Sequence, residues 1–262
     1  MHRGHRTLLL TATASYAVVA AGVLTTSPLV RLDWHVAMFK PYKQWPCAQG
    51  PLDVFVVAGQ RGPTAVAALA WLGWRSWRTG SARPVLVLGT ALALLNASVG
   101  AVKLGAGRLG PHYAHTVGSA ELFHDGMIFP SGHTANGVVV WGTLAYLAGR
   151  HRRAARVAAG LMAFGIGLAT VYLGTHWVSD VLGGWAAGAL VLLSLPLLEP
   201  FVAAAERRLG RFGRFGQGGG GGQDGRGGQD GRGGRLGGPD RLGARSPPAR
   251  RPRPCPTRSV SR

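Results

Sequence analysis

The sequence predicts an all-α integral-membrane protein, a bundle of six membrane-spanning helices followed by a disordered C-terminal tail. The chain has 262 residues, of which 47% are hydrophobic, and several apolar stretches approach the roughly 20 residues that cross a bilayer. Charged residues make up only 15%, below the roughly 25% of an ordinary soluble domain. The net charge of +19 lies mainly between the apolar stretches and in the tail. This combination favours a membrane protein with basic loops.

Six apolar stretches are candidates for the spans. The clear ones are residues 7–26, 84–102, 132–148, 157–174 and 178–198. The sixth, residues 52–74, is interrupted by Gln60-Arg61-Gly62-Pro63, and we include it because the distribution of charge requires it. The first stretch is longer than the apolar part of a typical signal peptide, which favours a membrane anchor.

Arginine clusters fix the predicted topology. They begin the chain and follow the second, fourth and sixth stretches, so six spans place all of them on one side of the membrane. By the positive-inside rule that side is the cytoplasm. We therefore expect a multi-pass protein of the cell membrane with both termini cytoplasmic. Residues 27–51, 103–130 and the turn around His176 then face outward.

The composition divides the chain into a membrane domain, residues 1–200, and a tail, residues 201–262. The tail is rich in Gly, Arg and Pro, and Gly-Gly-Gln-Asp-Gly-Arg at 221–226 recurs at 227–232. Such a segment buries too little apolar surface to offset its ordering entropy, so we predict disorder. A solvated cytoplasmic tail is the simplest interpretation, and attraction to anionic lipids is the functional one. No motif for specific nucleic-acid binding accompanies the charge.

Polar residues gather where three spans reach the predicted outer face. Ionisable side chains at membrane depth are costly, which makes them candidates for function. Those at the end of the third span and the start of the fourth and sixth are Lys103, Arg108, Ser131, Gly132, His133, His176 and Asp180.

His176 and Asp180 are four residues apart, which places both on one face of a helix. A carboxylate in that position accepts the imidazole N–H and leaves the other nitrogen free as a nucleophile or base. A pair that only caps the helix has the same spacing. The two residues alone therefore do not decide between these interpretations.

Pro130-Ser131-Gly132-His133 is typical of a helix start with Ser131 at the N-cap or in the first turn. The N–H groups there attract anions, and His133 can donate a proton to a bound group. An ordinary helix start with an incidental histidine fits equally well. Lys103 is either an anchor reaching the interface or a phosphate contact, and Arg108 offers a planar fork for phosphate oxygens.

Taken together, the motifs resemble the type 2 phosphatidic acid phosphatase family of membrane phosphatases over about residues 52–198. The order and spacing of the motifs agree, and the joint match is more specific than any one of them. The residues that carry the resemblance are Lys103, Arg108, Pro111, the run Pro130-Ser131-Gly132-His133, and the pair His176 and Asp180.

The resemblance implies a six-helix membrane fold and a role for each catalytic residue. His176 would attack phosphorus and form a phosphohistidine, Asp180 would orient it, and His133 would protonate the leaving oxygen. The family's substrates are lipid phosphates or polyprenyl diphosphates at the membrane, and it requires no metal or other cofactor.

The resemblance also implies a phosphate-binding set, Lys103, Arg108, Ser131 and Gly132. Two family arginines are replaced here, by Gly110 and by Thr170. Loss of two charged contacts to the transition state without compensation would cost roughly 10⁴-fold or more in rate. We expect Arg108 to carry more of the phosphate charge than in typical members.

Four other residues of the same outer loop are candidates for compensating the two arginines: His112, His115, His124 and Asp125.

Two other functions fit part of the pattern. A catalytically weak or inactive relative would bind lipid phosphate or scaffold envelope proteins, and the missing arginines favour it. A membrane metalloenzyme would use His124, His133 and His176 as ligands beside Asp125, although these form no recognised ligand spacing. Activity lost on chelation and restored by metal would select that third function. Cys47 and Cys255 form no disulfide framework or metal-ligand spacing.

Overall fold

The computed structural model describes residues 3–149 and 151–217, and this part of the chain is helical without any strand. The prediction of an all-α fold is confirmed. The predicted disorder of residues 218–262 concerns a segment outside the described residues. The elements are α1 (Arg3–Leu24), α2 (Pro28–Phe39), α3 (Pro41–Gln44), η1 (Pro46–Ala48), α4 (Gln49–Val56), η2 (Val57–Gly59), α5 (Arg61–Thr79), α6 (Arg83–Ala106), α7 (Gly132–Tyr146), α8 (Arg152–Tyr172) and α9 (Val178–Gln217).

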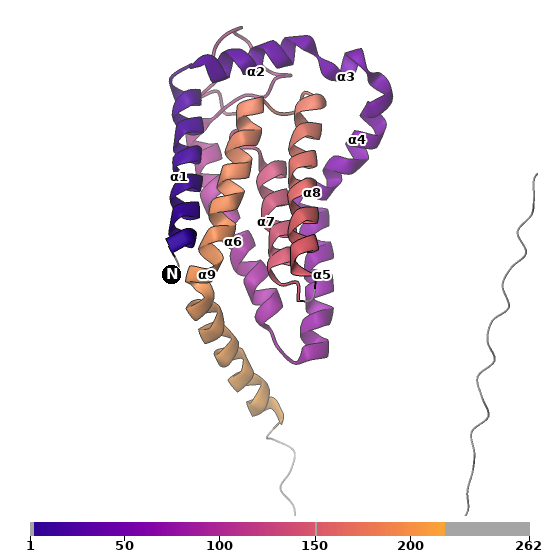
Figure 1. Cartoon of the computed structure of the whole chain (residues 1–262), viewed down its shortest axis with the longest axis vertical. Helices are drawn as coiled ribbons and strands as arrows, with labels where there is room; N and C mark the ends of the chain where they lie inside the picture. The colour runs from indigo at the N-terminus through magenta and orange to yellow at the C-terminus, as the bar shows by residue number, and fades with distance from the viewer. Residues whose placement is uncertain (1–2, 150, 218–262) are drawn as a thin grey trace, which may run out of the picture. The chain divides into compact units, whose positions relative to one another are not determined.

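Helices α1, α5, α6, α7, α8 and α9 run along a common direction, and the segments α2, α3 and α4 arch over one end of them (Figure 1). Helix α7 is the centre of the bundle and packs against α5, α6, α8 and α9. Because it is surrounded, even its polar side chains Asn136 and Thr143 are fully buried. The loop from α6 to α7 lies beneath the arch, at the end where α7 begins.

Four of the described helices are long and apolar enough to cross a membrane: α1, α6, α8 and the Val178–Gly210 part of α9. The prediction of a helical bundle with membrane-spanning helices is therefore confirmed. Helix α7 has only 15 residues, and α5 is less apolar along its length, so the count of six spans stays a prediction.

The predicted second span, residues 52–74, is not one continuous helix, and the chain breaks at the interruption that the sequence indicates. Helix α4 ends at Val56, η2 follows, and Gln60 adopts an extended conformation with ψ 139° before α5 begins at Arg61. Pro63 then occupies the first turn of α5, where a helix needs no N–H donor. The polar interruption in the sequence is thus a true break in the helix.

The predicted start of the tail at residue 201 is placed too early, because α9 continues to Gln217. Val202 is only 4% exposed and packs into the main core cluster. The Glu206 carboxylate accepts hydrogen bonds from the Ser81 hydroxyl at 2.6 Å and the Arg83 N–H at 3.2 Å. These contacts secure the helix beyond the point where the composition changes.

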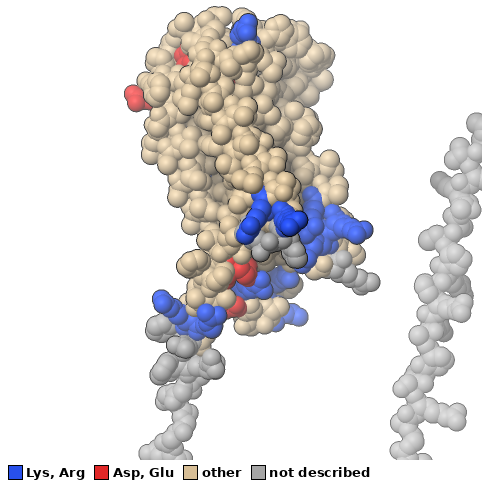
Figure 2. Space-filling model, turned by 60° about the vertical axis from the view of Figure 1, so that its left-hand side comes forward, with Lys and Arg blue, Asp and Glu red and all other residues tan. Residues whose placement is uncertain are grey.

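Basic side chains gather toward the lower end of the bundle, opposite the arch (Figure 2). The clusters at the end of α5 and the starts of α6 and α8 meet there, as the alternating directions of these helices require. Arg83 is paired with Glu199 at that end, with Nη2 2.5 Å from Oε1. One end of the described bundle is therefore basic, and the other carries few cations on the surface shown.

Glycines on α9 let it lie close to α7. A Cβ atom added at Gly188 would be 2.6 Å from Cβ of Val138 and 3.0 Å from the carbonyl oxygen of Ala135. Small residues at such contacts allow membrane helices to approach and gain packing energy.

We predict that Gly188→Ala destabilises the protein by about 1–3 kcal/mol, because α7 and α9 must separate to admit the methyl group. The measurement is thermal unfolding of the purified protein in detergent. Gly89→Ala is the matched control, since a Cβ at Gly89 meets nothing within 4 Å. Equal stability of the two variants would contradict the close α7–α9 contact.

Candidate active site

Two histidines from distant parts of the sequence face each other at the arched end of the bundle. His133 lies in the first turn of α7, and His176 lies in the turn between α8 and α9. Their ring centroids are 5.9 Å apart, with the rings inclined at 68°. The structure therefore brings together the two imidazoles that the sequence placed at one membrane face.

Both rings border one cavity of about 540 Å³. It lies between the start of α5, the end of α6 and the start of α7. The residues lining it are Gly59, Gln60, Arg61, Lys103, Met127, Ile128, Gly132, His133 and His176.

His176 is held so that one ring nitrogen faces a carboxylate. Its side chain is 6% exposed, and Nδ1 lies 3.5 Å from Oδ2 of Asp180. The atom forms no hydrogen bond with the described residues, so this contact is electrostatic in the present geometry. Nε2 is then the nitrogen available to the cavity.

Asp180 is fixed by hydrogen bonds to all of its oxygen atoms. Oδ2 accepts the N–H of Trp177 at 3.0 Å, and Oδ1 accepts Nη1 of Arg108 at 2.7 Å. The carbonyl oxygen of Asp180 accepts the Ser131 N–H at 2.8 Å. This last bond joins the start of α9 to the start of α7, so it couples the positions of His176 and His133.

Arg108 is buried inside the protein, not exposed to the cavity. It is 1% exposed, and Nη2 donates to Oδ2 of Asp33 at 2.8 Å. Nη1 also donates to the Ser179 hydroxyl at 2.6 Å, and Nε donates to the Ala120 carbonyl at 2.9 Å. All three nitrogens are engaged, so the geometry gives no support to the expected phosphate contact by Arg108.

Asp33 is a site residue that the sequence argument missed. It lies in α2 and is 1% exposed, and it accepts the N–H and hydroxyl of Ser179 as well as Arg108. Burial raises the pKa of Asp33, while Arg108 and the Ser179 hydrogen bonds oppose that shift. The sequence signal that could have identified Asp33 is that it is an acidic residue in the mostly apolar part of residues 27–51.

The charges of this group explain why Arg108 needs two partners. With Asp180 alone, the guanidinium would cancel the negative charge next to His176. The second carboxylate, Asp33, leaves a net negative charge on the ionised trio.

Ser131 and Gly132 play different parts at the start of α7. The Ser131 hydroxyl caps the helix by accepting the Thr134 N–H at 3.3 Å, as predicted. Its own N–H is already bound to Asp180 and the residue is fully buried, which leaves no support for a phosphate contact by that amide. Gly132 does line the cavity, in the first turn, where helix N–H groups lack acceptors within the helix.

Two cations border the cavity beside Gly132. Nζ of Lys103 donates to the carbonyls of Met127 and Ile128. A Cβ atom added at Gly132 would lie 3.8 Å from that Nζ and 3.4 Å from Nη2 of Arg61. Lys103 was predicted for the site, whereas Arg61 was treated only as an interruption of a span.

The outer-loop residues considered for compensation lie elsewhere. The ring of His112 packs against Tyr42, and the ring of His115 lies 6.2 Å from that of His124. None of them, nor Asp125, lines the cavity. Among the described residues, no group of three or more His, Cys, Asp or Glu side chains is placed to hold a metal ion, so the metalloenzyme hypothesis has no support here.

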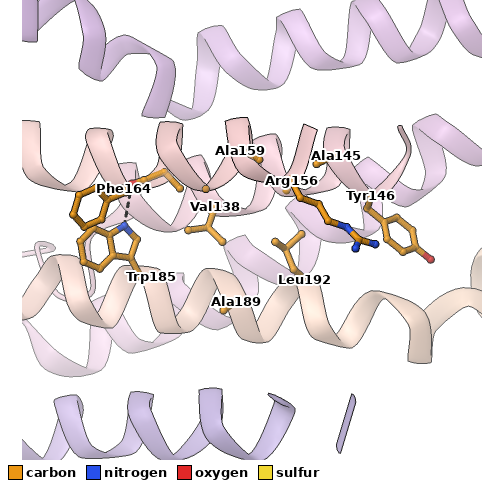
Figure 3. A pocket seen from close by; sticks show the side chains of 12 residues that line it. Val138, Ala145, Tyr146, Arg156, Ala159, Phe164, Trp185, Ala189 and Leu192 are labelled. Carbon is orange, nitrogen blue, oxygen red and sulfur yellow. Dashed lines mark hydrogen bonds between the residues drawn. The ribbon is translucent and has the colours of Figure 1, made fainter. Parts of the chain in front are cut away.

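Another cavity, of about 520 Å³, lies between α7, α8 and α9 (Figure 3). Phe164 and Trp185 lie toward one end of it, with Tyr146 and Arg156 toward the other. Its lining contains no histidine, cysteine or carboxylate. Of these two cavities, only the one bordered by His133 and His176 offers imidazole groups.

Comparison with known proteins identifies related sequences and folds. The model of the PAP2 superfamily matches residues 84–201. Phosphatidylglycerophosphatase B of Bacillus subtilis (strain 168) is 38% identical over 80 residues, which cover 28% of this chain. This chain thus matches only 39% of the length of that relative.

The fold matches that in the crystal structure of a transmembrane PAP2 type phosphatidylglycerolphosphate phosphatase from Bacillus subtilis. The TM-score is 0.55, and the match covers 75% of this chain and 96% of that one. At 20% identity, this likeness concerns the fold.

We predict that Asp33→Asn lowers the free energy of unfolding by about 3 kcal/mol, because it removes one partner of a buried ion pair. Asp53→Asn, an exposed position in α4, is the matched control. Chemical unfolding of both variants in detergent checks the difference. A loss no greater than that of the control would show that the buried network does not stabilise the fold.

Proposed function

We propose that this chain, whose residues 84–201 match the model of the PAP2 superfamily, is an integral-membrane lipid phosphatase. The observation that best supports this proposal is that His133 and His176, with ring centroids 5.9 Å apart, line the same cavity as Lys103. One ring is available as a nucleophile and the other as an acid, and a cation lies between the spans to hold phosphate. These are the elements that metal-free phosphoryl transfer requires.

In the first step Nε2 of His176 attacks phosphorus and forms a P–N bond. The bond from phosphorus to the lipid oxygen breaks, and its electron pair stays on that oxygen. His133 donates a proton to the oxygen, so the lipid leaves as an alcohol, or as a monophosphate when the substrate is a diphosphate. Asp180 stabilises the positive charge on the His176 ring, 3.5 Å away.

In the second step water attacks the phosphohistidine. His133, now neutral, accepts a proton from the water. The P–N bond breaks, its electron pair returns to Nε2, and inorganic phosphate leaves. Neither step calls for a metal ion, so we expect activity to survive chelators.

The substrate class follows from the position of the site and from the relatives. The cavity opens at the end of the bundle where membrane helices end, which is where lipid headgroups lie. The similar curated protein is named a phosphatidylglycerophosphatase. We propose a lipid phosphate or polyprenyl diphosphate as the substrate and the surrounding bilayer as the protein's setting.

The basic clusters support an outward-facing site. They lie at the end of the bundle opposite the cavity (Figure 2), and basic ends face the cytoplasm. We therefore propose that the cavity opens on the extracytoplasmic face.

The second candidate is a relative that binds lipid phosphate without hydrolysing it. The observation in its favour is the absence of arginine at Gly110 and Thr170. The fixed geometry of His133, His176 and Asp180 supports catalysis instead. A binding protein would not need an acid facing a nucleophile.

We predict that purified protein incubated with ³²P-labelled phosphatidic acid in detergent and quenched in alkali carries acid-labile label. His176→Ala abolishes both the label and phosphate release, because the attacking nitrogen is gone. His35→Ala, in α2 and away from the cavity lining, is the matched control. Wild-type protein that binds the lipid but never releases phosphate would select the second candidate.

The proton-donor role gives the same experiment a second variant. His133→Ala should slow release of a lipid alcohol by about 10²–10⁴-fold. With p-nitrophenyl phosphate the loss should be much smaller, since that leaving group departs without a proton. Equal losses on both substrates would remove His133 from the acid role.

The orientation can be tested with the two native cysteines. Cys47 is exposed in η1, at the arched end. We predict that a membrane-impermeant maleimide labels Cys47 in intact cells expressing Cys255→Ser. With Cys47→Ser, label reaches Cys255 only after permeabilisation. The reverse pattern would place the cavity on the cytoplasmic side.

A further inference from the structure

We infer that Arg61 is the phosphate-binding arginine of this site and takes over from the motif arginines absent at Gly110 and Thr170. The inference rests on the proposed function. Arg61 belongs to α5 and lies outside residues 84–201, the part that matches the family model. The matched family model therefore assigns it no role.

The first support is convergence of charge on one point. The Nη2 atom of Arg61 and the Nζ atom of Lys103 both come within 4 Å of the position where a Cβ of Gly132 would stand. The absence of that Cβ leaves the space open at the amino-terminal turn of α7. An anion there would meet two cations and the N–H groups of a helix start.

The second support is that the Arg61 side chain has no partner. Its guanidinium forms no hydrogen bond or ion pair with the described residues, and the side chain is exposed at the cavity. By contrast, Nη1 of Arg75, in the same helix, donates to the Leu147 carbonyl at 3.0 Å. Two positive groups near one point repel each other, and a bound phosphate relieves that repulsion.

The third support is that α7 fixes the turn from which Arg61 emerges. Nδ2 of Asn136 donates to the carbonyl of Gly59 at 3.1 Å and to the Thr64 hydroxyl at 2.8 Å. Nε1 of Trp141 donates to the Ala58 carbonyl at 3.0 Å. Two side chains of one helix thus anchor both sides of the break.

The same turn is pressed against the helix that carries the proposed acid. A Cβ at Gly59 would stand 3.0 Å from the carbonyl oxygen of His133 and 2.6 Å from Ile166. The contact between Gly59 and the start of α7 therefore sets the positions of Arg61 and His133 relative to each other. Groups held in this way by packing and supporting hydrogen bonds are preorganised for binding.

The chemistry needs only electrostatic contact. The planar fork of Arg61 offers two N–H donors to non-bridging phosphoryl oxygens, and Lys103 offers a point charge to a third. Charge on these oxygens is stabilised most where donors are fixed before the reaction. Arg61 forms no covalent bond and transfers no proton.

The test compares Arg61→Ala and Arg61→Lys with wild type, using short-chain phosphatidic acid in detergent micelles. We expect kcat/KM to fall about 10²–10³-fold for Arg61→Ala, with Arg61→Lys between the two because it keeps the charge and loses the fork. Arg78→Ala, at the other end of α5, is the matched control and should behave as wild type. Thermal unfolding of Arg61→Ala should match wild type, since no internal bond is lost.

Inhibition by orthovanadate and binding of inorganic phosphate separate this inference from the proposed function. If wild type hydrolyses the lipid and Arg61→Ala is as active and as sensitive to vanadate as Arg78→Ala, the inference is overturned and the function stands. If wild type does not hydrolyse the lipid but binds phosphate, and Arg61→Ala binds it far more weakly, the function fails and the inference stands. If wild type neither hydrolyses lipid nor binds phosphate, both fall.

Discussion

The buried ionic network of Arg108 with Asp33 and Asp180 is the constraint on which the site depends. Burying a charge costs several kcal/mol, so these groups persist only with their hydrogen bonds complete. The network requires α2 to fold back over the bundle, because Asp33 comes from that helix. It also fixes the start of α9 through Asp180 and Ser179. From there the bond to the Ser131 N–H reaches α7, so one interaction sets the distance between both imidazoles.

The break in the helix before α5 is a local irregularity, and it places the positive charge of Arg61 at the cavity. A continuous helix over residues 52–74 would carry Arg61 through the hydrocarbon region, where a cation is costly. The break places it at the cavity instead, and the carbonyls left without helical partners are bound by Asn136 and Trp141. Backbone of irregular conformation is tolerated at membrane depth where protein side chains satisfy it in this way.

The sequence predicts most of the fold and the central pair of the site, for identifiable reasons. Apolar runs of helical length set the positions of α1, α6, α7 and α8. The motifs place His133 at the start of the fourth predicted span and His176 at the start of the sixth. Because successive spans alternate in direction, both starts lie on the same side of the membrane. The environment of Arg108 depends on which residue α2 lays beside it, and no local pattern encodes that contact. The extent of α9 was missed because composition changes near residue 201, whereas Val202 and Glu206 still pack against the bundle.

Gly110 and Thr170 stand where the family motifs have arginine, and both residues pack inside the protein. Thr170 is 1% exposed, its hydroxyl donates to the Gly167 carbonyl at 2.8 Å, and its own carbonyl accepts the N–H groups of Thr175 and His176. A Cβ at Gly110 would meet Ile128 at 3.3 Å. Both residues are buried. A protein that had lost catalysis would be expected to leave these two positions unfilled and the side chain of His176 without a fixed position. Here the space is filled, the turn bearing His176 is secured by the substituted residue, and a cation enters the cavity from α5. That pattern favours a relocated phosphate site over a lost one.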